Sequence, residues 1–148
     1  MVKIEKPSQL LSYLKDRFGI VLPENMELTS SQKHGLRIHN KAVHGTSAWG
    51  VTGFLAHSGK EFNSYFIQLI GHFAKKNLIA LNSKDTQKYF EGQLISKNVK
   101  GEKGDVILIH GGHILGCGSH DGSGKIKPTI KKSRKILNAI KPYPGRNL

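Results

Sequence analysis

The chain is a basic protein of 148 residues, in which 23 lysines and arginines stand against 10 acidic residues and give a net charge of +13. Its length suits one domain or two small ones packed together, no segment approaches the ~18 apolar residues that span a bilayer, and its one cysteine excludes an internal disulfide. Because the N-terminus lacks the apolar core and cleavage site of a secretory signal, we expect a cytoplasmic protein with no membrane partner.

The first predicted element is a short amphipathic helix within residues 6–23. Ser8 is a plausible N-cap, and Gly19 stands where a C-terminal cap belongs. The apolar residues that recur at helical spacing, and that we expect to face the core, are Leu10, Leu11, Leu14 and Phe18. The pattern then changes to β and loop, with strands predicted over 35–39 and 48–55 between frequent glycines.

Two further helices are predicted in the middle of the chain. Ser64 caps the first, whose apolar pattern runs on until Asn77 ends it. Residues 78–81 form an apolar run typical of a strand. Ser83 caps the second helix, over residues 84–91. This part of the chain therefore alternates helix and strand.

A glycine-punctuated β-hairpin is the most informative segment of the sequence. Residues 105–109 are almost wholly apolar and β-branched after Asp105, which is typical of a strand buried on both faces or at a barrel core. Gly111 and Gly112 tolerate the positive φ that a two-residue hairpin turn requires. The return strand contains Gly116 and Gly118, and glycine inside a strand marks either a bend or a close approach of another backbone or a ligand. Both glycines are therefore candidate ligand contacts, with barrel curvature as the alternative.

A purely cationic segment follows this hairpin, since no acidic residue occurs after Asp121. A pI of about 10.0 is typical of a protein that binds a phosphate backbone, although a lysine-rich proteome would also produce it. Arginine can fork onto a phosphate, lysine offers a point charge, and a serine between them can donate to the same backbone. The candidate nucleic-acid contacts are Lys125, Lys127, Lys131, Lys132, Ser133, Arg134 and Lys135, together with Gly116 and Gly118. The alternative is a solvated cationic tail without a fixed site.

The order of several short phrases over residues 68–135 matches a known pattern. The matching pieces are Gly71-His72 with Lys75-Lys76-Asn77, Phe90 with Gly92, Gly104 with Leu115-Gly116 and Gly118, and Lys127 with Lys132-Ser133-Arg134. Together they resemble the C-terminal PUA-like extension of the Sun-family RNA cytosine-5 methyltransferases. The phrase at residues 14–23 is also similar to the helix that opens related archaeal-type proteins.

The resemblance implies an α+β protein with a PUA-like mixed β pseudobarrel and flanking short helices. The sequence divides into a small α/β N-terminal part over 1–60, the PUA-like domain over 61–140 and a tail over 141–148. The resemblance further implies binding of structured tRNA or rRNA, and Lys75 and Lys76 in the matching phrase join the candidate RNA contacts.

The methyltransferase domain itself is missing from the sequence. There is no glycine-rich cofactor loop after a strand and no Pro-Cys nucleophile motif. We therefore expect a non-catalytic RNA-binding protein without a cofactor. It would serve as an accessory to a separately encoded RNA-modifying enzyme or in ribosome assembly.

Two other interpretations remain open at this stage. His110, His113, Cys117 and His120 are residue types that bind zinc, and they would suit a small metal-dependent enzyme that acts on an anionic substrate. Chance clustering among 8 histidines is the alternative, with Cys117 a small buried hydrophobe. A protein-protein adaptor would instead use the helix face over residues 66–73.

Aromatic side chains offer a further way to bind RNA. Trp49, Phe54 and Tyr65 could stack on unpaired bases, or they could anchor the core. For a single tryptophan among glycines, the core role is the favoured interpretation.

Overall fold

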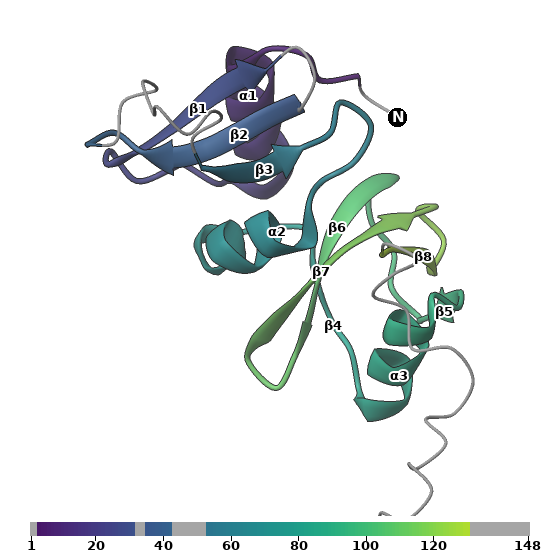
Figure 1. Cartoon of the computed structure of the whole chain (residues 1–148). Helices are drawn as coiled ribbons and strands as arrows, with labels where there is room; N and C mark the ends of the chain where they lie inside the picture. Colours follow the sequence, from purple (N-terminus) through teal and green to yellow (C-terminus); the bar gives the residue numbers. More distant parts are fainter. Residues whose placement is uncertain (1–2, 32–34, 43–52, 131–148) are drawn as a thin grey trace, which may run out of the picture.

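A computed structural model describes residues 3–31, 35–42 and 53–130, which form a mixed α+β structure (Figure 1). The strands form a three-stranded sheet of order β1-β2-β3 and a five-stranded sheet of order β4-β6-β7-β8-β5, which curls into a half-barrel. The helices of the described residues are α1 (Pro7–Phe18), α2 (Ser64–Ile70), the 3-10 turn η1 (Gly71–Phe73) and α3 (Ser83–Glu91). The strands are β1 (Met26–Ser31), β2 (Gly35–Asn40), β3 (Phe54–His57), β4 (Leu78–Ala80), β5 (Ile95–Ser96), β6 (Gly104–His110), β7 (His113–His120) and β8 (Lys125–Thr129).

The helix α1 confirms the first predicted element but begins two residues earlier than a Ser8 cap allows. Lys6 is the N-cap, and its backbone N–H donates to Oε1 of Gln9 at 3.0 Å. Pro7 at the first helical position explains this start, because its fixed φ suits the helix and the N–H that it lacks would have no helical partner. Gly19 caps the C-terminus at φ 68°, as predicted.

The other two helices begin one residue earlier than predicted. Asn63 accepts a hydrogen bond from the Tyr65 N–H at 2.9 Å, and Asn82 accepts one from the Asp85 N–H at 2.8 Å. The prediction that the first of them runs to Asn77 is wrong. The helix α2 ends at Ile70, η1 follows it, and the chain is extended at Ala74.

The hairpin at the centre of the half-barrel is formed as predicted. Gly111 and Gly112 turn the chain at φ 56° and 79°. In the middle of β6, Val106, Ile107 and Leu108 are buried. β4 pairs with β6 in parallel, and β8 pairs with β7 in antiparallel fashion. The half-barrel therefore includes residues 125–129, which the sequence indicated only as part of a basic segment.

The core divides into two apolar clusters. One lies inside the half-barrel and includes Tyr89, Leu108 and Ile126. The other joins α1, the three-stranded sheet and α2 to Ile107 and Cys117 on the outer face of the half-barrel. The expected boundary near residue 60 falls between β3 and α2, yet the second cluster continues across it. The two parts therefore share a core.

Candidate nucleic-acid interface

The outer face of the half-barrel carries a row of polar side chains at its exposed end. Paired residues of neighbouring antiparallel strands project from the same face, and the register aligns Asp105, Ser119 and Lys127. The next row on that face consists of Ile107, Cys117 and Thr129. Because Ile107 and Cys117 are buried under the N-terminal part, the Asp105 row lies where this coverage ends.

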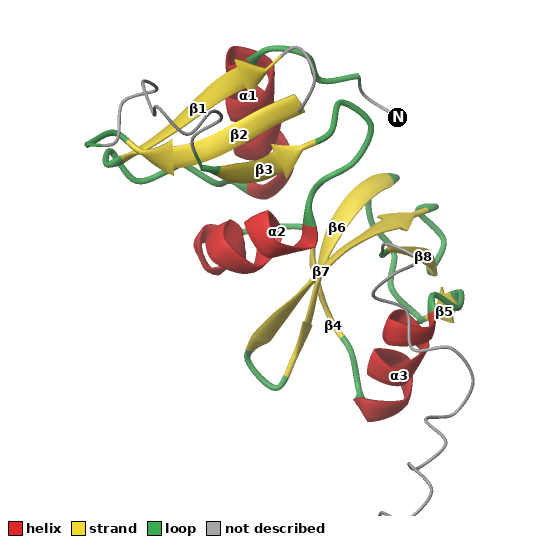
Figure 2. Ribbon diagram, viewed as in Figure 1, coloured by secondary structure: helices red, strands yellow, loops and turns green. Residues whose placement is uncertain are grey.

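A cleft of about 560 Å³ lies between this outer face and the N-terminal part. Tyr13 and Arg17 of α1 line it together with Lys60 and Glu61 of the loop between β3 and α2. In Figure 2 this loop lies next to the start of β6. The half-barrel lines the cleft with Lys103, Gly104, Asp105, Ser119 and Thr129. Hydroxyl, carboxylate and ammonium groups thus surround a single space.

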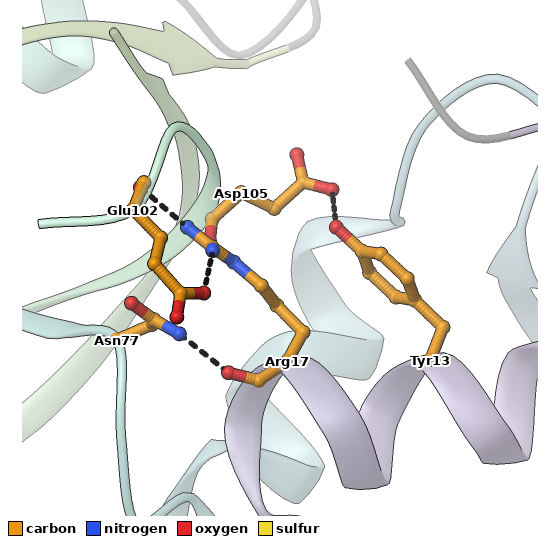
Figure 3. Close-up of polar contacts among 5 residues, drawn as sticks. All are labelled: Tyr13, Arg17, Asn77, Glu102 and Asp105. Atoms are coloured by element: carbon orange, nitrogen blue, oxygen red, sulfur yellow. Dashed lines mark hydrogen bonds and ion pairs between the residues drawn. The ribbon is translucent and has the colours of Figure 1, made fainter. Parts of the chain in front are cut away.

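Arg17 fixes the geometry of the cleft by clamping α1 to the half-barrel (Figure 3). Its side chain is only 8% exposed. Nε donates to the Asp105 carbonyl at 2.7 Å, while Nη1 and Nη2 donate to the Glu102 carboxylate and carbonyl at 3.1 and 3.0 Å. From the other side, Nδ2 of Asn77 donates to the Arg17 carbonyl at 2.6 Å. The two walls of the cleft are therefore held in one arrangement.

Tyr13 adds a second link across the same interface. Its hydroxyl donates to Oδ2 of Asp105. Burial, helped by this hydrogen bond to the carboxylate, holds the pKa of Tyr13 well above its usual range. The hydroxyl therefore stays protonated and remains a donor.

Several lysines around the cleft are not neutralised. Lys60, Lys103 and Lys127 are exposed, and within residues 3–31, 35–42 and 53–130 none of them forms an ion pair. Two carboxylates, those of Glu61 and Asp105, line the same cleft, and the Asp105 carboxylate keeps its charge while it accepts from Tyr13. The rim of the cleft therefore presents more positive than negative charge to an approaching ligand.

The predicted basic contacts that can be placed lie on the surface. Lys125 and Lys127 project outward from β8, whereas Ile126 and Pro128 between and beside them are buried. Lys75 and Lys76 are exposed beside the end of α1, where both backbone N–H groups donate to the Phe18 carbonyl. The remaining predicted contacts, Lys131, Lys132, Ser133, Arg134 and Lys135, lie outside the described residues.

Gly116 and Gly118 are buried in β7. A Cβ at Gly116 would meet the hydroxyl of Tyr89, and one at Gly118 would lie 2.8 Å from Cγ2 of Ile126. Neighbouring side chains therefore already occupy the space that the missing side chains leave. This placement favours the structural interpretation of both glycines over a direct RNA contact.

His120 lies far from the other two histidines of the hairpin. His110 and His113 pair across the turn, whereas His120 pairs with Gly104 at the opposite end of β7, about 23 Å along the strand from His113. His110 contacts the Leu81 carbonyl, and His120 accepts a hydrogen bond from the Gly124 N–H. In the described part of the chain, no group of three or more His, Cys, Asp or Glu side chains is placed to hold a metal ion. Burial raises the pKa of the Cys117 thiol, which disfavours the reactive thiolate.

The structure does not gather the aromatic candidates into one surface, and it buries part of the proposed adaptor face. Phe54 and Tyr65 are exposed on different elements, and Trp49 lies outside the described residues. On α2, Phe66 and Ile70 are buried, whereas Leu69 is 40% exposed. Phe73 in η1 is 43% exposed, so the predicted adaptor face over residues 66–73 divides between core and surface.

None of the residues that line the cleft was predicted as a site residue, and those with polar groups that suit a ligand include Lys60, Lys103, Ser119 and Thr129. Lys60 and Lys103 belong to different parts of the chain, and their proximity depends on the arrangement of those parts. The strand period did not place Ser119 and Thr129 either, because β8 was not predicted as a strand and the hairpin register is shifted. Regular pairing across Gly111-Gly112 would set Asp105 opposite Gly118, and the register shift between Leu108 and Ile109 is what brings Ser119 opposite Asp105.

No protein-family model matches the chain, and a search of curated proteins finds no similar sequence. No helix of the described residues is long and apolar enough to cross a membrane.

Proposed function

We propose that this chain is a non-catalytic RNA-binding protein whose half-barrel is a PUA-like pseudobarrel. It binds a structured tRNA or rRNA in the cytoplasm, mainly through phosphate contacts and shape. It acts as an accessory in RNA modification or ribosome assembly, in which a separately encoded modifying enzyme is its natural partner.

The observation that carries the proposal is the cationic face beside the cleft, whose lysines form no ion pair within the described part of the chain. Lys127 and Lys125 project from β8, and Lys60 and Lys103 line the cleft next to them. Phosphate oxygens are the acceptors that such a set of ammonium groups suits best. The strand β8 also leads directly into residues 131–135, which add four further basic residues by sequence.

A second cationic position supports contact with an extended backbone. Lys75 and Lys76 precede β4, and β4 is three strand spacings from β8 in the sheet, about 14 Å along its surface. An RNA of folded shape can contact both positions at once, whereas a small anion cannot. The separation of the two positions therefore favours a macromolecular polyanion.

Charge reversal on β8 tests the assignment of this face. We expect the double variant Lys125→Glu/Lys127→Glu to weaken binding to a folded tRNA by at least about tenfold at 150 mM salt, because phosphate contacts dominate such affinity. The control is Lys41→Glu/Lys84→Glu, which changes the net charge equally at exposed positions outside the cleft. Equal weakening by the two double variants, measured by fluorescence anisotropy, would show that only net charge matters and would contradict the assignment.

A further inference from the structure

We infer that the cleft between the two parts holds one unpaired ribonucleotide of the bound RNA and recognises its 2′-hydroxyl. This inference rests on the proposed function and adds to it a basis for distinguishing RNA from DNA. It assigns the phosphate to Lys60 and Lys103 and the ribose to Asp105, Ser119 and Thr129.

The size and the lining of the cleft support this occupant. Its volume of about 560 Å³ lies within the roughly 300–1,000 Å³ of clefts that hold small ligands. Such a space admits one nucleotide unit that has left a stack, and it is too confined for a base-paired helix. The occupant is therefore an unpaired residue of a loop, bulge or end, which is the usual target of specific RNA recognition.

The polar groups inside the cleft match a ribose better than a phosphate. Asp105 uses one carboxylate oxygen to accept from Tyr13, and a carboxylate has about four acceptor sites. A 2′-hydroxyl can donate to the remaining sites and accept from the hydroxyl of Ser119 or Thr129. A phosphate at that position would meet the negative charge of Asp105, so it is expected near the ammonium groups of Lys60 and Lys103 instead.

The walls of the cleft are preorganised, which makes recognition of a single hydroxyl effective. Arg17 holds Asp105 by its carbonyl, and Tyr13 holds the carboxylate of the same residue. Ser119 and Thr129 are fixed on neighbouring strands. A ligand that lacks the 2′-hydroxyl therefore leaves polar groups in the cleft without the partner that RNA provides.

The test compares two stem-loops with the same RNA stem, one with ribose and one with 2′-deoxyribose in its loop nucleotides. We expect the wild-type protein to bind the ribose loop about tenfold more tightly, as the loss of one or two hydrogen bonds predicts. The variant Ser119→Ala/Thr129→Val should abolish this preference and leave the affinity for the deoxyribose loop unchanged. The variant Lys60→Ala/Lys103→Ala should weaken both complexes by a similar factor, because it removes phosphate contacts.

The outcomes separate this inference from the proposed function. Failure of the wild-type protein to bind either stem-loop would overturn both. Equal binding of the two stem-loops, or a preference that survives in Ser119→Ala/Thr129→Val, would overturn the cleft assignment while RNA binding stands. A Lys60→Ala/Lys103→Ala variant with wild-type affinity for both would also overturn it. Circular dichroism of each variant confirms that these exposed and half-exposed substitutions leave the fold intact.

Discussion

Gly116 is a glycine because Tyr89 occupies the space in which a side chain would stand. We expect Gly116→Ala to lower the free energy of unfolding by about 1–3 kcal/mol, as overpacking does. The loss should be smaller in a Tyr89→Phe background, since the ring carbon Cζ would lie 3.4 Å from the added Cβ, an ordinary contact. Urea denaturation of the four proteins of this double-mutant cycle measures the coupling between the two positions.

The same variants separate a structural glycine from a ligand contact. If Gly116 serves only the interior, Gly116→Ala in the Tyr89→Phe background keeps its RNA affinity. A large loss of RNA affinity in that variant, without a change in its stability, would instead show that Gly116 contacts the RNA.

His57 makes the stability of the cleft loop depend on pH. Burial lowers the pKa of His57, and its Nδ1 accepts a hydrogen bond from the Gly59 N–H at 2.9 Å, so the folded protein favours the neutral ring. The unfolded chain therefore binds the proton more readily. The stability from the neutral ring is present above the ordinary histidine pKa of about 6.5 and is lost as the pH falls below it.

We expect the free energy of unfolding to fall between pH 7 and pH 5 with a contribution from His57 of at most about 1.4 kcal/mol per pH unit. His57→Gln, whose side-chain carbonyl can still accept a hydrogen bond, should flatten this part of the profile. Denaturant titrations at several pH values measure the slope. Identical slopes for the variant and the wild type would contradict this role of His57.

At the scale of the elements, the two helix ends that a left-handed glycine caps were predictable, whereas the end of α2 and the helix starts were not. Gly19 and Gly92 adopt left-handed φ values of 68° and 71°, and glycine is the residue that does so most readily. At the starts, asparagine immediately precedes the serines at 64 and 83, and both residue types are good caps. Local sequence does not decide between two adjacent caps, and the structure selects the asparagine in each case.

The cap of α3 provides a direct test of that assignment. We expect Asn82→Ala to reduce the free energy of unfolding by about 1 kcal/mol, because the Asp85 N–H loses its side-chain acceptor. Ser83→Ala should change it by less than about 0.5 kcal/mol. Thermal unfolding of both variants distinguishes the caps, and a larger effect at Ser83 would refute the observed helix start.

The strands, too, were predictable only where the residues that define them are adjacent in sequence. The hairpin of β6 and β7 was predictable because Gly111-Gly112 and the apolar run before it lie next to each other in sequence. β8 was not, since its alternation of buried Ile126 and Pro128 with exposed lysines is short and also reads as a basic segment. The pairing with β7 is what makes it a strand.

At the scale of the whole molecule, the cleft depends on the Arg17 clamp. We expect Arg17→Met to lower the free energy of unfolding by about 2–3 kcal/mol, since it removes hydrogen bonds from a charged donor to Glu102 and Asp105. Lys15→Met, an exposed change on the same helix, should alter it by no more than about 0.5 kcal/mol. Similar small effects of both substitutions in urea denaturation would contradict the clamp.

The candidate site illustrates why sequence alone reaches only part of an interface. The cationic character of residues 125–135 follows from composition, so it could be predicted. The cleft could not, because Lys60, Lys103 and Ser119 come together only when the N-terminal part docks on the half-barrel. By sequence, Arg17 looks like an ordinary basic residue near a helix end. Its burial and its hydrogen bonds depend on Glu102 and Asp105, which lie more than eighty residues away in the chain.

The most direct test of RNA binding is fluorescence anisotropy with a folded tRNA, a single-stranded RNA and a duplex DNA over a series of salt concentrations. We predict micromolar or tighter binding of the folded RNA that survives about 150 mM salt and exceeds the affinity for the other two. Equal binding of all three that disappears as salt rises would contradict the account, because it would reflect only the attraction between a basic protein and any polyanion.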